Sequence, residues 1–504
     1  MLPAETAYLF RHSLLRDAAY QLQLPSDRAR LHGLAFALIE EICGGRPPVP
    51  AELEAEEELA LAPHATDAFA EDLAEHARLA EKSRDVRAIY IRRAAELSEQ
   101  RFRHSAAQAY WEAFADLVEG IPRGVALTRA GGAARADGRM QDAERLLREA
   151  LALADAPGGE KLKTLALSTL SVVCLRTGRS QAAESMCREV LERHLKAGDR
   201  RGEGAALGDL ALLCQEAGRI DEAERAGNRA LAIAREFGDR HSEGITLRDL
   251  AGLALVTGRV DEAEQMYLQA LAILEEVGNV RSHALTLGNL ATLYLETGRA
   301  GEAAKTYETC LSILRLVGDR RSESTIMGNL ANLHREAGRF AQARRLNEQA
   351  LRLLREAGDR RGEGFTLANL AMLAHDEGRP EEAESATRTS LAIFRDIGDR
   401  RGEGVLLGNL ASILRDSRRE ELAATMYLEA LQIHREVGHR RYDGIHSCDF
   451  ARCLLSLGRF AEAQSAWRHG IEILRALHDL SRVERQVVAM REACRKAGVP
   501  ALEA

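Results

Sequence analysis

The sequence predicts an all-α protein, a solenoid of stacked two-helix units, from its composition and from two columns of recurring residues. The 504 residues include only 10 prolines and 4% aromatic residues, a mixture that favours helix. A glycine followed by arginine recurs every forty residues, at Gly138, Gly178, Gly218, Gly258, Gly298, Gly338, Gly378 and Gly458, with Arg418 as the one break. An alanine five places later recurs without a break from Ala143 to Ala463. Self-similarity at a fixed period of this length indicates stacked repeats.

Each forty-residue unit is expected to form two helices that cannot bury their apolar faces alone. The first helix places one face at the i, i+3, i+4 and i+7 positions, for example at Leu287, Leu290, Ala291 and Tyr294. A glycine then ends this helix where the backbone turns left-handed, as at Gly298. The second helix gathers its own face at Ala303, Tyr307, Cys310, Leu311 and Val317. Neighbouring units must therefore stack.

The phrase "GDRRGEG" before the first helix is predicted to turn a corner rather than to bind a ligand. Gly398 follows one helix, Asp399 can cap the next, and Glu403 falls in the first turn, where the helix dipole favours negative charge. Arg400 and Arg401 are expected to be solvated or paired with carboxylates of adjacent units. Glycine also recurs inside the first helix, at Gly288, Gly328 and Gly408. Glycine is unfavourable in a helix, so we expect the neighbouring helix to pass too close for a side chain there.

Residues Leu290, Ala291, Gly298, Ala303 and Tyr307 together resemble the tetratricopeptide repeat (TPR), although Cys310 stands at the last small position and the period is 40 rather than the usual 34. The longer unit resembles the repeats of kinesin light chains and spindle-orientation adaptors. The resemblance covers residues 121–480 as nine units. It implies nine antiparallel helix pairs in a right-handed TPR α-solenoid superhelix, with residues 481–504 as a C-terminal capping helix and tail.

The same resemblance implies that an extended peptide or protein partner binds along the concave groove lined by the first helices. Asp or Asn recurs there in mid-helix, at Asp209, Asp249, Asn289, Asn329, Asn369, Asn409 and Asp449. One interpretation is an inter-unit hydrogen-bond ladder, and the other is that these side chains hydrogen-bond a bound peptide. The predicted partner-binding residues are Asn289, Asn329, Asn332, Arg335, Asn369, His375, Asn409, Ser412 and Arg415. The units from Asn329 to Arg415 are expected to form the most polar and basic inner stretch.

The front of the chain does not follow the forty-residue rule. Residues 8–41 carry "YLFRHSLLRDAAY" and a Leu-His helix, and they resemble the segment that links the ATPase core to the repeats in STAND-type signalling ATPases. We therefore expect a winged-helix-like remnant of that segment in residues 1–45, a small atypical module in front of the array. Residues 46–66 are Pro- and Glu-rich and are predicted to form a linker. Residues 67–120 are predicted to form atypical TPR-like helices, so that the array begins before residue 121.

The function that the sequence favours is that of a cytoplasmic protein-binding scaffold. We expect this scaffold to be the sensing or recruiting arm of a signalling system. The alternative is part or a degenerate relative of a STAND-type ATPase, with an ATPase domain in cis or in trans. We expect no enzyme, cofactor or metal site, because the chain has no nucleophile–base set and no phosphate-binding GxxxxGK[ST] loop. A formal net charge of -8 argues against nucleic-acid binding. No apolar run is long enough for a membrane span.

Overall fold

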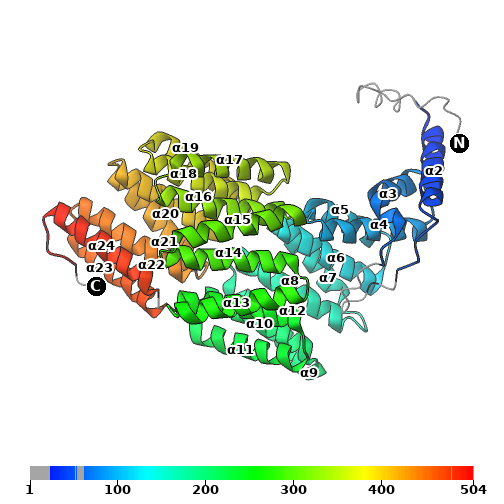
Figure 1. Ribbon diagram of the computed structural model, residues 1–504, viewed down its shortest axis with the longest axis horizontal. Coiled ribbons are helices and arrows are strands. Elements are labelled where there is room, and N and C mark those ends of the chain that lie inside the picture. Colours follow the sequence, from blue (N-terminus) through cyan, green and yellow to red (C-terminus); the bar gives the residue numbers. More distant parts are fainter. Residues whose placement is uncertain (1–22, 51–52, 54–61, 478, 503–504) are drawn as a thin grey trace.

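The computed structural model describes residues 23–50, 53, 62–477 and 479–502, and all regular secondary structure within them is helical. The all-α prediction is therefore confirmed. The N-terminal part contains α2 (Pro25–Ile42), the 3-10 turn η1 (Ala65–Phe69), α3 (Ala70–Leu79), α4 (Arg84–Gln100) and α5 (His104–Ala115). These helices extend from one end of the molecule, and the C-terminus lies at the other (Figure 1). Residues 8–22 of the STAND-like segment lie outside the described residues, so its resemblance stays a prediction.

Nine helix pairs follow within the described residues. In each pair we call the first helix A and the second helix B. The A helices are α6 (Gly120–Ala136), α8 (Glu160–Arg176), α10 (Arg200–Glu216), α12 (Arg240–Val256), α14 (Val280–Glu296), α16 (Arg320–Glu336), α18 (Arg360–Asp376), α20 (Arg400–Asp416) and α22 (Arg440–Ser456). The B helices are α7 (Met140–Leu153), α9 (Ser180–Ala197), α11 (Ile220–Glu236), α13 (Val260–Glu276), α15 (Ala300–Val317), α17 (Phe340–Glu356), α19 (Pro380–Asp396), α21 (Glu420–Glu436) and α23 (Phe460–Ala476).

The hydrophobic core runs along the stack between A and B helices. The alanine column of the B helices, from Ala143 to Ala463, is buried throughout. One continuous cluster extends from Phe36 in α2 to Leu253 in α12, so the N-terminal helices share the core of the array. At the other end α24 (Leu480–Ala497) packs on α22 and α23 and buries Met490 against them. No helix in the described part of the chain is long and apolar enough to cross a membrane.

The "GDRRGEG" phrase turns the chain between units, as predicted. Gly398 has a left-handed φ of 69°, and Asp399 accepts a hydrogen bond from the Gly402 amide at 2.9 Å. Inside each unit, a second column of glycines from Gly138 to Gly458 forms the turn from the A helix to the B helix. Arg418 replaces glycine in that column and takes the same left-handed conformation, with φ 58°. Caps of the same kind begin other A helices and α24, at Asp199, Asp239, Asn279, Asp319, Asp359 and Asp479.

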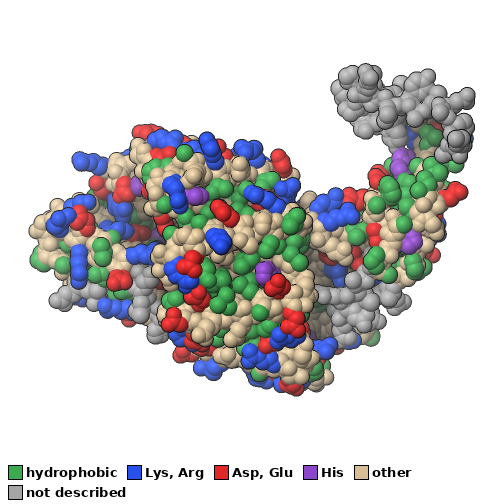
Figure 2. Space-filling view, in the orientation of Figure 1, with side chains coloured by type: hydrophobic (Ala, Val, Ile, Leu, Met, Phe, Trp, Pro, Cys, Tyr) green, Lys and Arg blue, Asp and Glu red, His purple; other side chains and the backbone are tan. Residues whose placement is uncertain are grey.

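The arginines of this phrase pair with carboxylates. The first arginine binds the glutamate of its own first turn, as in the 2.6 Å contact of Arg240 with Glu243. The second binds the capping aspartate of the next unit, as in the 2.8 Å contact of Arg361 with Asp399. Positive and negative side chains are correspondingly interspersed over the face shown in Figure 2. The expected pairing between adjacent units therefore holds for the second arginine of several units, but Arg400 pairs within its own unit and Arg401 pairs with the distant Glu216.

The glycine column inside the A helices marks close approach of the next A helix, as predicted. A Cβ added at Gly288 would lie 2.6 Å from Ile326, and one added at Gly328 would lie 3.0 Å from Asn369. At Gly408 the His446 ring would lie 2.0 Å away. Successive A helices therefore pack against one another along the inner face of the superhelix, which positions their outward-facing polar residues in one groove.

Candidate functional site

The column of Asp and Asn along the A helices is bonded within the fold at its ends but not in its middle. The Ser168 hydroxyl donates to Asp209 at 3.1 Å across one unit, and Gln486 donates to Asp449 at 3.3 Å. Among the described residues, no hydrogen bond links the side chains of Asn289, Asn329, Asn369 and Asn409. The ladder interpretation is therefore wrong for these four asparagines, whose amide groups are available to a ligand.

The basic residues predicted for the groove are held by acidic residues of the array. Arg335 forms an ion pair with Asp376 of the next unit. His375 lies 3.3 Å from Asp416, and Arg415 bonds the same carboxylate at 2.9 Å. Burial disfavours the Asp416 anion, but hydrogen bonds from His375 and Arg415 lower its pKa to about 2. A hydrogen bond to Asp416 raises the pKa of His375. The positive charges of this stretch are therefore paired with carboxylates and are less available to a partner than the sequence suggests.

Two other predicted residues belong to the same stretch. The Ser412 hydroxyl lies 2.8 Å from the Tyr427 hydroxyl of its own unit, which joins A to B helix. Asn332 stands at the equivalent position of its unit and is partly exposed. Because Ser412 already has an internal partner, its contribution to binding would need that bond to be shared or exchanged.

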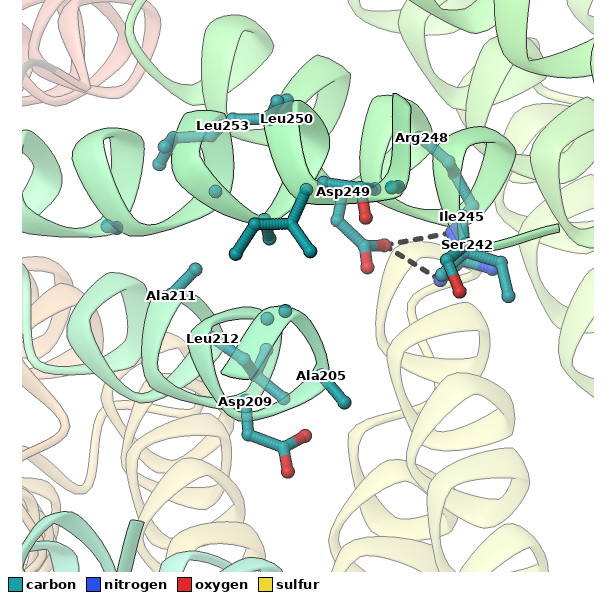
Figure 3. A pocket seen from close by; sticks show the side chains of 18 of the residues that line it. Ala205, Asp209, Ala211, Leu212, Ser242, Ile245, Arg248, Asp249, Leu250 and Leu253 are labelled. Atoms are coloured by element: carbon teal, nitrogen blue, oxygen red, sulfur yellow. Dashed lines mark hydrogen bonds and ion pairs between the residues drawn. The ribbon is translucent and has the colours of Figure 1, made fainter. Parts of the chain in front are cut away.

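A cavity of about 550 Å³ opens on the inner face between α10 and α12, with α11 behind it. Figure 3 shows Leu212, Ala211 and Ala205 on one side and Leu250 and Leu253 on the other. Three members of the Asp and Asn column lie at this cavity, namely Asp209, Asp249 and Asn289. Asn289 is the one predicted partner-binding residue that lines it.

The cavity exists because this unit lacks side chains that fill the other units. Gly227 stands where Tyr267, Tyr307, Tyr427 and Trp467 occupy their units. Leu250 moves into part of that space, since a Cβ added at Gly227 would lie 2.7 Å from its methyl group. Gly208 has open space in front of it, with nothing within 4 Å of an added Cβ. The glycine in the aromatic column is a sequence signal that would have located the site.

The cavity combines apolar surface with acidic groups at its edge. Leu212 is 44% exposed and Phe237 is 40% exposed, although both are large and apolar. Burial raises the pKa of Asp209, and the Ser168 hydroxyl bonds it directly. Asp249 is bonded by its neighbour Arg248 at 2.7 Å. The arrangement can hold an apolar side chain and accept hydrogen bonds or a positive charge beside it.

The described residues contain no group of three His, Cys, Asp or Glu side chains placed to hold a metal ion. The cysteines within the repeat units are buried. Burial raises the pKa of the Cys214 thiol to about 11 and that of Cys310 to about 12, which keeps both protonated and unreactive. These cysteines act as small packing residues, as their column positions suggest.

Comparison with known proteins assigns the chain to a family. A tetratricopeptide repeat model matches residues 123–196, 165–236, 203–276, 242–316, 282–356 and 322–396, and a second tetratricopeptide repeat model matches residues 405–437. The chain belongs to the tetratricopeptide repeat family. None of the curated proteins matches it.

Three solved structures show what the fold is similar to. A Rap protein complexed with Competence and Sporulation Factor is 12% identical, with 69% of this chain and 98% of that chain covered, at a TM-score of 0.50. The apo form of the quorum sensor NprR from B. thuringiensis is 13% identical (68% and 98% covered, TM-score 0.43). TPR-like repeats of a putative kinesin light chain from Podosopora anserina are 22% identical (38% and 94% covered, TM-score 0.33). At these identities the likeness concerns the fold alone.

Proposed function

We propose that this protein is a non-catalytic binding scaffold that holds an extended protein or peptide segment in its concave groove, anchored at the cavity between α10 and α12. The observation that carries this proposal is the apolar cavity of about 550 Å³ with Asp209, Asp249 and Asn289 at its edge. An apolar side chain of the partner fills the space that Gly227 leaves open. The partner's backbone donates to and accepts from the asparagine column further along the groove.

The similarity to the Rap protein supports this mode of use, because that structure contains the same kind of helical array in complex with a factor. An extended ligand suits a solenoid, because each unit adds one more polar contact at a regular spacing. Burial of one apolar side chain of the partner in the cavity then contributes affinity, and hydrogen bonds to the Asp and Asn column fix the position of the partner along the groove. Specificity in this scheme comes from the cavity unit, which differs from the other eight units in having glycine, Gly227, at that position of its B helix.

The first test concerns the cavity itself. Gly208→Trp is expected to occupy the cavity, because Gly208 lines it and nothing lies within 4 Å of an added Cβ. Proteins captured by the wild-type chain from cell extract should be lost or reduced about tenfold with this variant. The matched control is Thr309→Trp, which places the same side chain on the exposed outer face of α15. Equal capture by both variants and wild type would remove the cavity from the binding site.

A second test concerns the asparagine column. Replacing Asn329, Asn369 and Asn409 by Ala is expected to weaken partner binding while changing the free energy of unfolding by less than about 1 kcal/mol. No internal hydrogen bond is lost, and Ala is the better helix former. Thr309→Ala together with Thr389→Ala, on the outer face, serves as control. A large fall in melting temperature with unchanged affinity per folded molecule would contradict the role of the asparagines.

We further propose that the array is the recruiting arm of a signalling system in which an ATPase domain acts in cis or in trans. The resemblance of residues 8–41 to the linking segment of STAND-type ATPases supports this context. Because the sequence lacks a phosphate-binding loop, the chain alone is expected to neither bind nor hydrolyse ATP. Isothermal titration with Mg-ATP should give no heat of binding. Saturable micromolar binding at one site would show that the chain itself carries the nucleotide function.

A further inference from the structure

The superhelix returns on itself, and units of an early turn touch units of a later turn along one edge. The Ser180 hydroxyl, at the turn between α8 and α9, donates to the Val437 carbonyl at 2.9 Å, although 257 residues separate them. A Cβ added at Gly178 would lie 2.3 Å from the Val437 side chain, and one added at Gly218 would lie 2.4 Å from Leu477. We call this contact the inter-turn seam, formed by Gly178, Ser180, Glu216 and Gly218 on one edge and Arg401, Val437, Gly438 and Leu477 on the other.

From Gly178 to Gly218 the contact advances by forty residues on each edge, from Val437 to Leu477, which marks it as a property of the superhelix. One unit before Gly178, an added Cβ at Gly138 would lie 3.3 Å from Arg361. Before that, Phe102 at the turn between α4 and α5 stacks under the Arg281 guanidinium, 4.8 Å from the ring centroid. The distance of 257 residues corresponds to between six and seven units of forty residues. The A–B turns of the early units thus rest on the loops between the late units.

The seam changes the exposed fraction of the residue that directly follows each B helix. Val277 and Phe237 follow their B helices and are 39% and 40% exposed. Val437 and Leu477 occupy the same place in later units, yet they are 3% and 5% exposed. The repeat itself leaves this position open to solvent, so the burial of the later two comes from the first turn of the superhelix.

One ion pair crosses the seam because the A helix α22 has no capping aspartate: His439 stands at its N-cap. Arg281, Arg361 and Arg441 each bind the capping aspartate of the next unit. For Arg401 the equivalent position of the next unit is His439 rather than an aspartate, so Arg401 lacks the carboxylate partner that the other arginines have. Its guanidinium instead bonds Glu216 at 2.5 Å, 185 residues away. A sequence change in one unit therefore supplies the charge contact that joins two turns.

We propose that the inter-turn seam is a gate that controls side access to the concave groove. When the seam is closed, the inner face is enclosed by one complete turn, and a segment flanked by folded domains cannot enter from the side. The seam consists of glycine backbone, two apolar side chains, one hydroxyl and one ion pair. The principal helix–helix contacts of the fold lie within and between neighbouring units and not across the seam, so the seam is expected to open before any unit unfolds. The inference rests on the proposed function, because it names how the binding groove is regulated.

The test reverses the charges across the seam. Glu216→Arg faces Arg401 with a like charge and is expected to open the gate, whereas Glu216→Arg with Arg401→Glu restores the pair. Ser180→Cys with Gly438→Cys reports closure, because the Ser180 Cβ lies 3.8 Å from a Cβ built at Gly438, the separation typical of a disulfide. Disulfide formation should slow about tenfold in the Glu216→Arg background and recover in the charge swap. Gel mobility under non-reducing conditions measures the rate.

Access to the groove is measured separately and needs no partner. Leu212→Cys is placed in the cavity of a chain that also carries Cys43→Ser and lacks the seam cysteines. A maleimide carried on a rigid gold cluster should label it about tenfold faster with Glu216→Arg than with wild type or the charge swap, while N-ethylmaleimide reacts equally with all three. Equal disulfide and labelling rates in all three backgrounds would overturn the gate. Capture of a partner is a separate readout, so loss of capture with a working gate would count against the proposed function alone.

Discussion

Acidification from pH 7 to pH 5 is expected to lower the stability of the C-terminal units by about 3–4 kcal/mol, because two buried histidines cannot accept a proton in the fold. His434 in α21 and His446 in α22 are buried, and their ring nitrogens lie 3.0 Å apart. Burial lowers the pKa of His434 to about 2, with a further contribution from His446, and burial lowers the pKa of His446 to about 4. Both rings are therefore neutral in the folded protein near pH 7.

The sign follows from which state binds the protons. An unfolded chain titrates its histidines near pH 6.5, so below that pH the unfolded state takes up protons that the folded state refuses. This stability is fully present above pH 6.5 and is lost as the pH falls towards the folded pKa values. Each histidine contributes about 2 kcal/mol between pH 7 and pH 5. His439, Tyr442 and Tyr427 pack around the pair, and Arg401 and Asp449 are the charged groups beside it.

Native-state hydrogen exchange of amides in α22 measures this loss region by region, which suits a repeat array whose units need not unfold together. The matched variant is His434→Leu with His446→Leu, since Leu354 and Leu406 stand at these positions in earlier units. Removing both ring partners together leaves no unsatisfied polar group, so the variant should fold. Its α22 stability should fall much less between pH 7 and pH 5 than that of the wild type, with a remaining response from His439, whose pKa burial lowers to about 3. An equal acid response in wild type and variant would show that other groups cause it.

Alanine at two equivalent glycines is expected to have opposite effects. Gly408→Ala should destabilise the protein by about 1–3 kcal/mol, because the added Cβ meets the buried His446 ring at 2.0 Å and would displace it from His434. Gly208→Ala, at the same position five units earlier, meets nothing within 4 Å. It should stabilise the protein by about 0.5–1 kcal/mol, because Ala restricts the unfolded chain and favours helix.

Denaturant unfolding of the two variants side by side checks this pair. The change in midpoint should be downward for Gly408→Ala and upward for Gly208→Ala. His446→Leu combined with Gly408→Ala separates the two causes, because a flexible side chain can yield where a packed ring cannot. If both glycine variants shifted the midpoint in the same direction, close approach of the next A helix would not be the reason that glycine recurs in this column.

Local features of this protein could be predicted from its residues because they depend on neighbours in the chain. A capping aspartate bonds the amide three residues on, as Asp399 does with Gly402, and a glycine after a helix needs only its own left-handed conformation. The close approach at Gly408 was also predictable, since a helix that repeatedly tolerates glycine implies a neighbour at that place. Each of these features is settled within one unit or between adjacent units, which the forty-residue period already describes.

The groove was predicted only in outline. The column from Asp209 to Asn409 was recognised, but its basic stretch was misjudged, because the carboxylates that hold Arg335 and His375 come from the following unit. The cavity was not predicted because it is a space that no side chain fills, and a sequence pattern shows only the side chains that are present. Gly227 removes a side chain, but a cavity results because Leu250 and the two flanking A helices do not fill the space that is left.

By itself the sequence determined the helices, their turns and caps, and the order in which they stack, because these follow from residue types repeated at fixed spacing. The tertiary structure alone decided that Ser180 meets Val437 and that Glu216 meets Arg401. Whether two turns touch depends on the small rotation from each unit to the next, summed over six or more units. A change in that rotation too small to alter any local pattern moves the far edge by many ångströms, so no single motif encodes the closure.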